Sequence, residues 1–280
     1  MSLMPPRPRS QSRAGIQSVV RAARILGLFT VAAPRLTLAE ITTLAGMSKA
    51  TAHRYAAALR TVNLLRYDAA SGYSLGPQVL RLGAAARAGL PVVSIAGLFM
   101  RRLVQQVNET AVLSVWDGEA PVVVRTEDNV DRVVRVSIAT GSRLAASSAQ
   151  SRVFSAFLPE AEVPGLRSRL RGSPELRRSL EEVRQAGVAV NLNNEFGIAT
   201  IAAPVFGSGS ILASLALVGT AATITSDPRS PIARRLRDVA ADISSELGGV
   251  DVDDPNGRSV PARPAGRAPA AKRKRRATGS

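Results

Sequence analysis

Cysteine is absent from the 280-residue chain, and histidine occurs once, as His53. The absence of cysteine excludes disulfides, thiolate metal sites and a cysteine nucleophile, and it fits a reducing cytoplasmic environment. A single histidine without cysteine also excludes metal sites built on these two ligand types. The sequence therefore predicts no bound metal and no other cofactor.

Long apolar runs are missing as well. No stretch approaches the roughly 18 consecutive apolar residues that a membrane-spanning helix needs. The segment 1–15 is rich in proline and arginine and lacks the apolar core of a secretory signal. We therefore expect a cytoplasmic protein with no membrane partner. Its length and its 45% hydrophobic content suit two globular domains, each with its own core.

Acidic residues are scarce at both ends of the chain. The formal net charge is +16, and residues 1–80 carry ten Arg or Lys against Glu40 and Asp68. Residues 251–280 carry eight basic and three acidic residues, whereas residues 81–250 are nearly balanced, with nineteen basic and sixteen acidic residues. Basic ends favour a polyanionic partner, and nucleic acid is the commonest one. An arginine-rich coding bias is the other explanation, since 34 of the 37 basic residues are arginine.

Composition and periodicity divide the chain into five parts. Residues 1–15 are predicted to form a disordered basic arm, and residues 250–280 a disordered basic tail with almost no large apolar side chain. Residues 16–76 are predicted to form a domain of short helices that ends in a hairpin. Residues 77–90 form a helical connector with a proline in its first turn, and residues 91–249 form a second domain of alternating helices and strands.

Capping residues mark short helices within the first domain. A helix is predicted over 18–29, with Ser18 as its cap. Thr37 and Glu40 then form a capping box at the start of a second helix, which Gly46 ends. The apolar stripe of this second helix is predicted to contain Ile41, Leu44 and Ala45. Ser48 caps a third helix over 49–62, and two short helices joined by a glycine-containing turn make a helix-turn-helix.

The helix over 49–62 has the pattern of a DNA-recognition helix. Ala52, Tyr55, Ala56 and Leu59 are spaced to face the core, which turns the first exposed turns toward a partner. An ordinary solvated helix would explain this pattern alone, but the capping box and the glycine break before it favour the major groove of DNA. The residues predicted to contact bases or phosphates are Ser48, Lys49, Thr51, His53 and Arg54.

A hairpin is predicted after this helix. Strand-like residues 64–67 and 73–75 flank a turn that contains Gly72, and together they would form a wing. Arg66 is predicted to lie near DNA phosphates, while Tyr67 and Tyr73 pack the hairpin. Arginines of the basic arm would reach the DNA backbone or minor groove, namely Arg7, Arg9 and Arg13.

With these motifs in place, the sequence resembles the IclR family of transcriptional regulators. The N-terminal resemblance lies in LTLAEI at 36–41, GMSKATAHR at 46–54 and YSLG at 73–76. The C-terminal resemblance lies in GSRL at 141–144, IAAPVF at 201–206 and LALVG at 215–219. It covers roughly residues 16–248.

The resemblance implies an α+β protein of two domains, in which a winged helix-turn-helix is joined by a linker helix to a GAF-like α/β effector-binding domain. It also implies double-stranded operator DNA as a partner and a homodimer or tetramer as the assembly. Local patterns agree with this fold. They predict strands over 111–116, 121–125, 133–138, 198–206 and 211–218, and helices over 147–157, 174–186 and 231–247.

By the same resemblance, a small-molecule effector would be bound by Ser148, Ala149, Gln150, Asn191, Thr200, Ala216 and Val218. Thr200 stands where many members have cysteine, and Ala216 and Val218 stand where some members that bind small organic acids have serine. Ala146 stands where many members have histidine, so the metal site of some relatives is not expected here. A site with few donors discriminates by shape and apolar contact, which favours an apolar or aromatic effector over a small carboxylate. Simple core packing is the alternative for these residues.

The sequence offers no support for an enzyme. His53 lies on the predicted recognition helix, so no Ser-His-Asp arrangement is available, and Gly207-Ser208-Gly209 is better explained as a hairpin turn than as a dinucleotide-binding motif. We expect a sequence-specific regulator, more often a repressor, whose operator affinity depends on an effector. The alternatives are a non-specific nucleoid-type protein that binds DNA through its basic ends, and an adaptor that uses its helix-turn-helix for protein contact.

Overall fold

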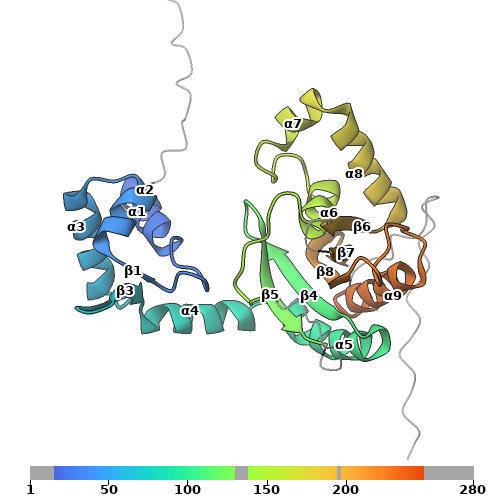
Figure 1. Cartoon of the computed structure of the whole chain (residues 1–280), viewed down its shortest axis with the longest axis horizontal. Coiled ribbons are helices and arrows are strands. Elements are labelled where there is room, and N and C mark those ends of the chain that lie inside the picture. The colour runs from blue at the N-terminus through green and yellow to red at the C-terminus, as the bar shows by residue number, and fades with distance from the viewer. Residues whose placement is uncertain (1–15, 130–137, 194–196, 249–280) are drawn as a thin grey trace, which may run out of the picture. The chain divides into compact units, whose positions relative to one another are not determined.

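The computed structural model describes residues 16–129, 138–193 and 197–248 (Figure 1). The predicted basic arm, the predicted basic tail and nearly all of the strand predicted over 133–138 lie outside these residues.

Three helices surround the first core. They are α1 (Gln17–Leu26), α2 (Leu38–Ala45) and α3 (Lys49–Thr61). Ile25, Ile41, Ala52 and Leu59 are buried between them. Apolar residues at helical spacing on each element therefore face one common interior, as the sequence predicted.

Two sequence predictions about these helices were wrong. Ser18 does not cap α1, because the helix already begins at Gln17 after Ile16 and has no side-chain cap, and it ends at Leu26 rather than at Phe29. Leu44 does not belong to the apolar stripe of α2. Ile41 and Ala45, one turn apart, turn inward, whereas 59% of the Leu44 surface is exposed.

A small antiparallel sheet completes the first domain. Its strands are β1 (Arg35–Leu36), β2 (Leu65–Asp68) and β3 (Gly72–Leu75), in the order β1-β3-β2. The β2–β3 hairpin confirms the predicted wing, and the two-residue β1 was not predicted. The connector α4 (Pro77–Ala88) follows, with Pro77 in its first turn as expected and with no buried residue.

The second domain is built on an antiparallel sheet in the order β5-β4-β8-β7-β6. Its strands are β4 (Thr110–Trp116), β5 (Pro121–Glu127), β6 (Ala189–Asn193), β7 (Ile198–Gly207) and β8 (Ser210–Thr220). Ser208 and Gly209 have φ values of 49° and 83° and connect β7 to β8, which confirms the predicted hairpin turn. The sequence pattern did not reveal β6, whose alternate positions include two asparagines.

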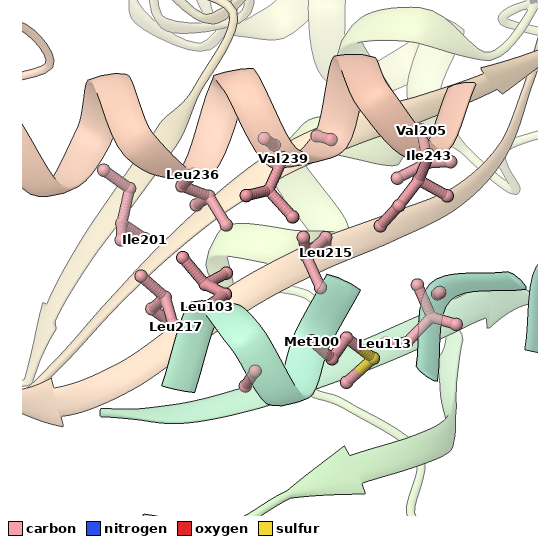
Figure 2. Packing of buried hydrophobic residues seen from close by; sticks show 14 of the residues in the cluster. Met100, Leu103, Leu113, Ile201, Val205, Leu215, Leu217, Leu236, Val239 and Ile243 are labelled. Carbon is pink, nitrogen blue, oxygen red and sulfur yellow. The ribbon is translucent and has the colours of Figure 1, made fainter. Parts of the chain in front are cut away.

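Two helices cover one face of this sheet. They are α5 (Pro91–Val107) and α9 (Pro231–Glu246). Figure 2 shows Met100 and Leu103 of α5 and Leu236 of α9 directed toward Leu215 and Leu217 of β8. Full burial of one such side chain contributes about 1.5–3 kcal/mol, so this layer is the principal apolar core of the domain.

The opposite face of the sheet carries α6 (Ala149–Phe157), α7 (Leu166–Gly172) and α8 (Pro174–Ala186). Val153 and Phe154 of α6 pack against Ala202 and Ala216 of the sheet and against Leu180 of α8. The helices α6 and α8 were predicted, but α5 and α7 were not identified from the sequence.

None of the described helices is long and apolar enough by itself to cross a membrane. The helices α4 and α5 reach that length and composition only together, and they are bent by 75° at the break between them.

Candidate nucleic-acid interface and effector site

Capping interactions build the helix-turn-helix. The Thr37 side chain accepts a hydrogen bond from the Glu40 amide at 3.2 Å, and the Glu40 carboxylate accepts one from the Thr37 amide at 2.7 Å. The hydrogen bonds that the Thr37 amide and the Thr37 hydroxyl donate to this carboxylate lower the pKa of Glu40, the bond from the amide most. Gly46, at φ 62°, ends α2 in the left-handed conformation that favours glycine. The capping box and the glycine break are therefore as the sequence predicted.

The first turns of α3 present polar side chains to solvent. Ser48 caps the helix by accepting a hydrogen bond from the Thr51 amide at 3.3 Å. Lys49, His53 and Arg54 are exposed and Thr51 is half-buried, while Ala52 and Ala56 on the opposite side are fully buried. A helix held by one face, with donors on the other, can enter a major groove.

The wing lies beside this helix and contacts it through the ring of Tyr67. The rings of Tyr67 and Tyr73 lie 4.9 Å apart, and the Arg60 guanidinium of α3 lies 5.3 Å from the centre of the Tyr67 ring. Arg66 is exposed on β2. Arg60 was predicted only to face outward, and its contact with Tyr67 gives it a role in positioning the wing.

The predicted effector residues of the sheet share one face. Asn191 of β6 pairs with Thr200 of β7, and Thr200 pairs with Val218 of β8, so their side chains form one row across three strands. Ala216 lies two positions from Val218 on β8 and points to the same face. Asn191 and Thr200 are half-buried, whereas Ala216 and Val218 are buried.

The other predicted effector residues lie at the start of α6, which covers this face. The Ser148 hydroxyl caps the helix by accepting a hydrogen bond from the Ser151 amide at 3.1 Å, and Ala149 is fully buried. The Gln150 side chain is also buried. Its amide nitrogen donates to the Ser114 hydroxyl at 3.0 Å and to the Ser214 carbonyl at 3.2 Å. Both protons of this amide are thus directed to strands β4 and β8 of the sheet.

The segment 138–148 closes the same face along β5. The Val123 amide donates to the Ser142 carbonyl at 3.0 Å, and the Gly141 amide donates to the Val123 carbonyl at 2.7 Å. Ile138 and Leu144 of the segment pack against a small apolar cluster formed by Val112, Val123 and Val218. Of the predicted effector residues, Val218 belongs to this apolar cluster, and the sequence analysis did not assign the other members of the cluster to the site.

Arg143 anchors this segment to the β4–β5 turn. Its guanidinium forms ion pairs with Asp117 at 2.6 Å and with Glu119 at 3.0 Å. Partial burial acts to raise the pKa of Asp117, but hydrogen bonds from the Ala120 and Glu119 amides and from Arg143 outweigh it, and the pKa is lowered overall.

Arg152 is a further polar group on this side of the sheet, and sequence reasoning missed it. It extends from α6 and donates from Nη2 to the carbonyl of Val190, the residue before Asn191. Its Nε is buried and has no hydrogen-bond partner among the described residues. Burial lowers the pKa of this guanidinium. An arginine within the otherwise uncharged helix 149–157 was the available sequence signal.

Metal-binding groups were also sought in the described part of the chain. It contains no cluster of three or more His, Asp or Glu side chains that could hold a metal ion.

Both halves of the chain resemble known proteins. The family model "IclR helix-turn-helix domain" matches residues 18–69, and "Bacterial transcriptional regulator IclR C-terminal" matches residues 84–245. The regulator KipR of Bacillus subtilis is 29% identical over 83% of this chain and 97% of its own length. The transcriptional repressor AllR of Escherichia coli K12 is 25% identical over 84% of this chain and 91% of its own length.

Solved structures agree with the family models. HmgR of Pseudomonas aeruginosa is 32% identical, with a TM-score of 0.52, over 84% of this chain and 99% of its own. A putative IclR regulator of Silicibacter sp. TM1040 is 25% identical, with a TM-score of 0.72, over 83% and 96% of the two chains. An IclR homologue of Microbacterium hydrocarbonoxydans, solved with 4-hydroxybenzoate, is 22% identical, with a TM-score of 0.67, over 82% and 98%.

These matches span both halves of the chain and confirm the predicted architecture, with an N-terminal helix-turn-helix and a C-terminal α/β domain. The chain is a member of the IclR family of DNA-binding transcriptional regulators.

Proposed function

We propose that this regulator represses transcription from a specific operator and that a small molecule, bound on the α6 face of the large sheet, changes its affinity for that operator. The observation that carries the DNA-binding part is the exposed start of α3 beside the wing. There Lys49, Thr51, His53 and Arg54 would contact bases or phosphates, with Ser48 contributing its backbone amide and Arg66 reaching a phosphate from the wing.

DNase footprinting on the DNA upstream of its own gene tests this proposal. At about 150 mM salt with competitor DNA, where non-specific phosphate binding is weak, we expect one bounded and symmetric footprint. Arg54→Ala should abolish it, because this side chain lies on the face that would enter the groove. Arg102→Ala, an exposed arginine of α5, is the matched control and should leave the footprint intact. Uniform protection that disappears with salt would instead support a nucleoid-type protein.

The assembly is proposed to be a homodimer, or a pair of dimers, in the cytoplasm. Ile16, Val19 and Val20 are at least half exposed at the start of α1, and α4 has no buried residue although Leu80 and Leu82 are large and apolar. A 12-residue helix without tertiary packing is marginal in water, so a second copy of the chain is the occupant we expect. Sedimentation of the wild type and of Leu80→Glu should show a dimer and its weakening, and a monomeric wild type would contradict this assembly.

The effector is proposed to have an apolar or aromatic body. The apolar cluster of Val112, Val123 and Val218, closed by Leu144, supports this, since it offers contact area and few donors. Arg152 at the β6 end adds one half-buried cation, which suits an acid group on such a molecule better than a neutral one. A small acid without an apolar body would leave most of this surface unused.

Two isosteric probes test the effector class. Calorimetric titration with 4-hydroxybenzoate and with 4-hydroxybenzamide compares the same ring with and without a charge. We expect the acid to bind at least about tenfold more tightly, which corresponds to about 1.4 kcal/mol. Arg152→Met should remove this preference. Equal binding of the two probes would contradict the role of Arg152, and tight, specific binding of a small ketoacid would contradict the aromatic effector.

The division of the chain into an arm at 1–15, a DNA-binding domain at 16–76, a linker at 77–90, an effector domain at 91–249 and a tail at 250–280 is part of the same proposal. The end of β3 at Leu75 and the start of α5 at Pro91 support its inner boundaries. Limited proteolysis should cut first outside 16–249, and an early cut within β4 or β8 would contradict the division.

A further inference from the structure

Strand β5 faces two different environments. Val123 belongs to the apolar cluster on the effector side of the sheet. Two residues later, Arg125 lies on the opposite side, because Val124 is an extra, bulged residue of β5 opposite Leu113 and Ser114 of β4, which shifts the pairing by one residue. A short length of β5 thus reaches both the effector site and the helix layer behind the sheet.

Arg125 contacts the first two turns of α5. Its Nη1 donates to the Val93 carbonyl at 3.4 Å. Its guanidinium also lies directly over Gly97, where a Cβ atom would come within 2.6 Å of Cζ, so a larger residue at this position would displace the guanidinium. On the other side Nε and Nη2 donate to one Glu127 oxygen at 2.9 and 2.5 Å. The guanidinium is therefore held between the strand and the helix.

The helix that Arg125 touches is the one that the linker leads into. Only Gly89 and Leu90 separate the end of α4 from Pro91, and Val93 lies in the first turn of α5. The outer edge of β5 pairs with the segment 138–148, which closes the effector site. A displacement of β5 or of this segment would consequently change the position of Arg125 relative to the base of the linker.

We propose that Arg125 is a positioning residue for regulation, which couples the effector site to the linker between the two domains. The inference rests on the proposed function, in which an effector changes operator affinity. It adds a structural route for this coupling, namely the contact between β5 and α5 that Arg125, Gly97 and Glu127 form. A planar guanidinium with hydrogen bonds on both sides transmits a shift better than a layer of apolar contacts, since its bonds have a fixed geometry.

Coupling between two sites is reciprocal, so the operator itself can serve as the probe. We would measure amide hydrogen exchange of residues 138–144 and of β5 in the full chain, with and without operator DNA. In the wild type, DNA should change these exchange rates by about fivefold or more. In Arg125→Met this change should be lost, while operator affinity in the absence of effector stays within about threefold of the wild type, a difference below 1 kcal/mol.

Two further variants make the experiment decisive. Arg184→Met is the matched control, because Arg184 also joins two elements, donating to the Ala156 carbonyl at 2.7 Å and pairing with Glu181 at 3.1 Å, but it lies on α8. It should keep the response to DNA. Arg125→Lys keeps the charge but loses the planar guanidinium, so its hydrogen exchange should change only weakly when DNA binds. This variant keeps the test available if Arg125→Met does not fold.

Three outcomes would overturn the proposal. These are a wild type whose exchange does not respond to the operator, an Arg125→Met variant that responds fully, and an Arg184→Met variant that loses the response equally. Failure of the proposed function would look different, because the footprint itself would then be missing.

Discussion

Single polar side chains determine where the helices of both sites begin. Thr37 and Ser48 cap α2 and α3 through bonds to residues three positions later, so the sequence alone predicted them. Gln150 is different. Its partners Ser114 and Ser214 lie 36 and 64 residues away in sequence, and no local pattern could place them beside α6. The contact of Arg152 with Val190 spans 38 residues of sequence and was not predicted for the same reason.

Thr37→Ala should lower the free energy of unfolding by about 1 kcal/mol, the usual cost of a lost cap. Thr43→Ala is the matched control, since the Thr43 hydroxyl donates to the Ala39 carbonyl inside the helix and caps nothing. Urea unfolding of the two variants checks this. A loss for Thr43→Ala as large as that for Thr37→Ala would show that the capping box contributes nothing specific.

Gln150→Ala should cost about 1–3 kcal/mol of stability, because it leaves the buried Ser114 hydroxyl without its donor. We expect the preference for 4-hydroxybenzoate over 4-hydroxybenzamide to survive in this variant, since the Gln150 amide is directed into the sheet. Thermal unfolding and calorimetric titration measure the two effects. A variant of normal stability that binds neither probe would assign Gln150 to effector contact instead.

At the scale of elements, alternation and helical spacing predicted the strands and helices that have one buried and one exposed side. The helix α3 and the strand β3 are examples. The buried residues of α5 do recur at helical spacing, but this helix was missed because Ile95, Leu98 and Phe99 are apolar as well and hide the polar side that the pattern needs. It failed for β1, which is two residues long and exists only by pairing with β3. Tertiary contact, rather than local preference, determines such elements.

The segment 138–148 should loosen in acid. Because the folded pKa of Asp117 is lowered from its ordinary value of 3.8, its ion pair with Arg143 stabilises the fold fully above that value and is lost as pH falls through the folded pKa. The pair is partly exposed, so we expect at most about 1 kcal/mol.

Asp117→Asn provides the test of this pH dependence. The difference in unfolding free energy between wild type and variant should be constant near neutral pH and shrink below pH 3.8, where the wild-type carboxyl becomes protonated. Glu160→Gln is the control, since Glu160 pairs with Arg167 at 3.5 Å on the exposed α7 side. A difference that grows toward acid would contradict the assigned partner.

At the scale of the whole molecule, the excess of basic charge lies at the two ends of the chain. Both chain ends are strongly basic, whereas residues 81–250, which hold the effector sheet, are nearly neutral. Specificity would come from the few side chains of α3 and the wing, while charge at the ends would add affinity for any duplex. The basic ends therefore favoured a polyanionic partner and the helix-turn-helix pattern identified it as DNA, although neither carries information about which operator is bound.

If specificity comes from α3 and the wing, the tail should affect only the strength and the salt dependence of DNA binding. Removal of residues 251–280 should leave the footprint on the operator unchanged in position while weakening the dependence of affinity on salt. The run of five basic residues at 272–276 could contribute at most about 4.5 to the slope of log K against log salt, or about 500-fold in affinity between 50 and 200 mM. Replacing these five residues by serine controls for chain length and should reproduce most of the effect of the deletion, which also removes Arg258, Arg263 and Arg267. If the footprint itself shifts or disappears, the tail reads sequence, and specificity would not reside in α3 and the wing alone.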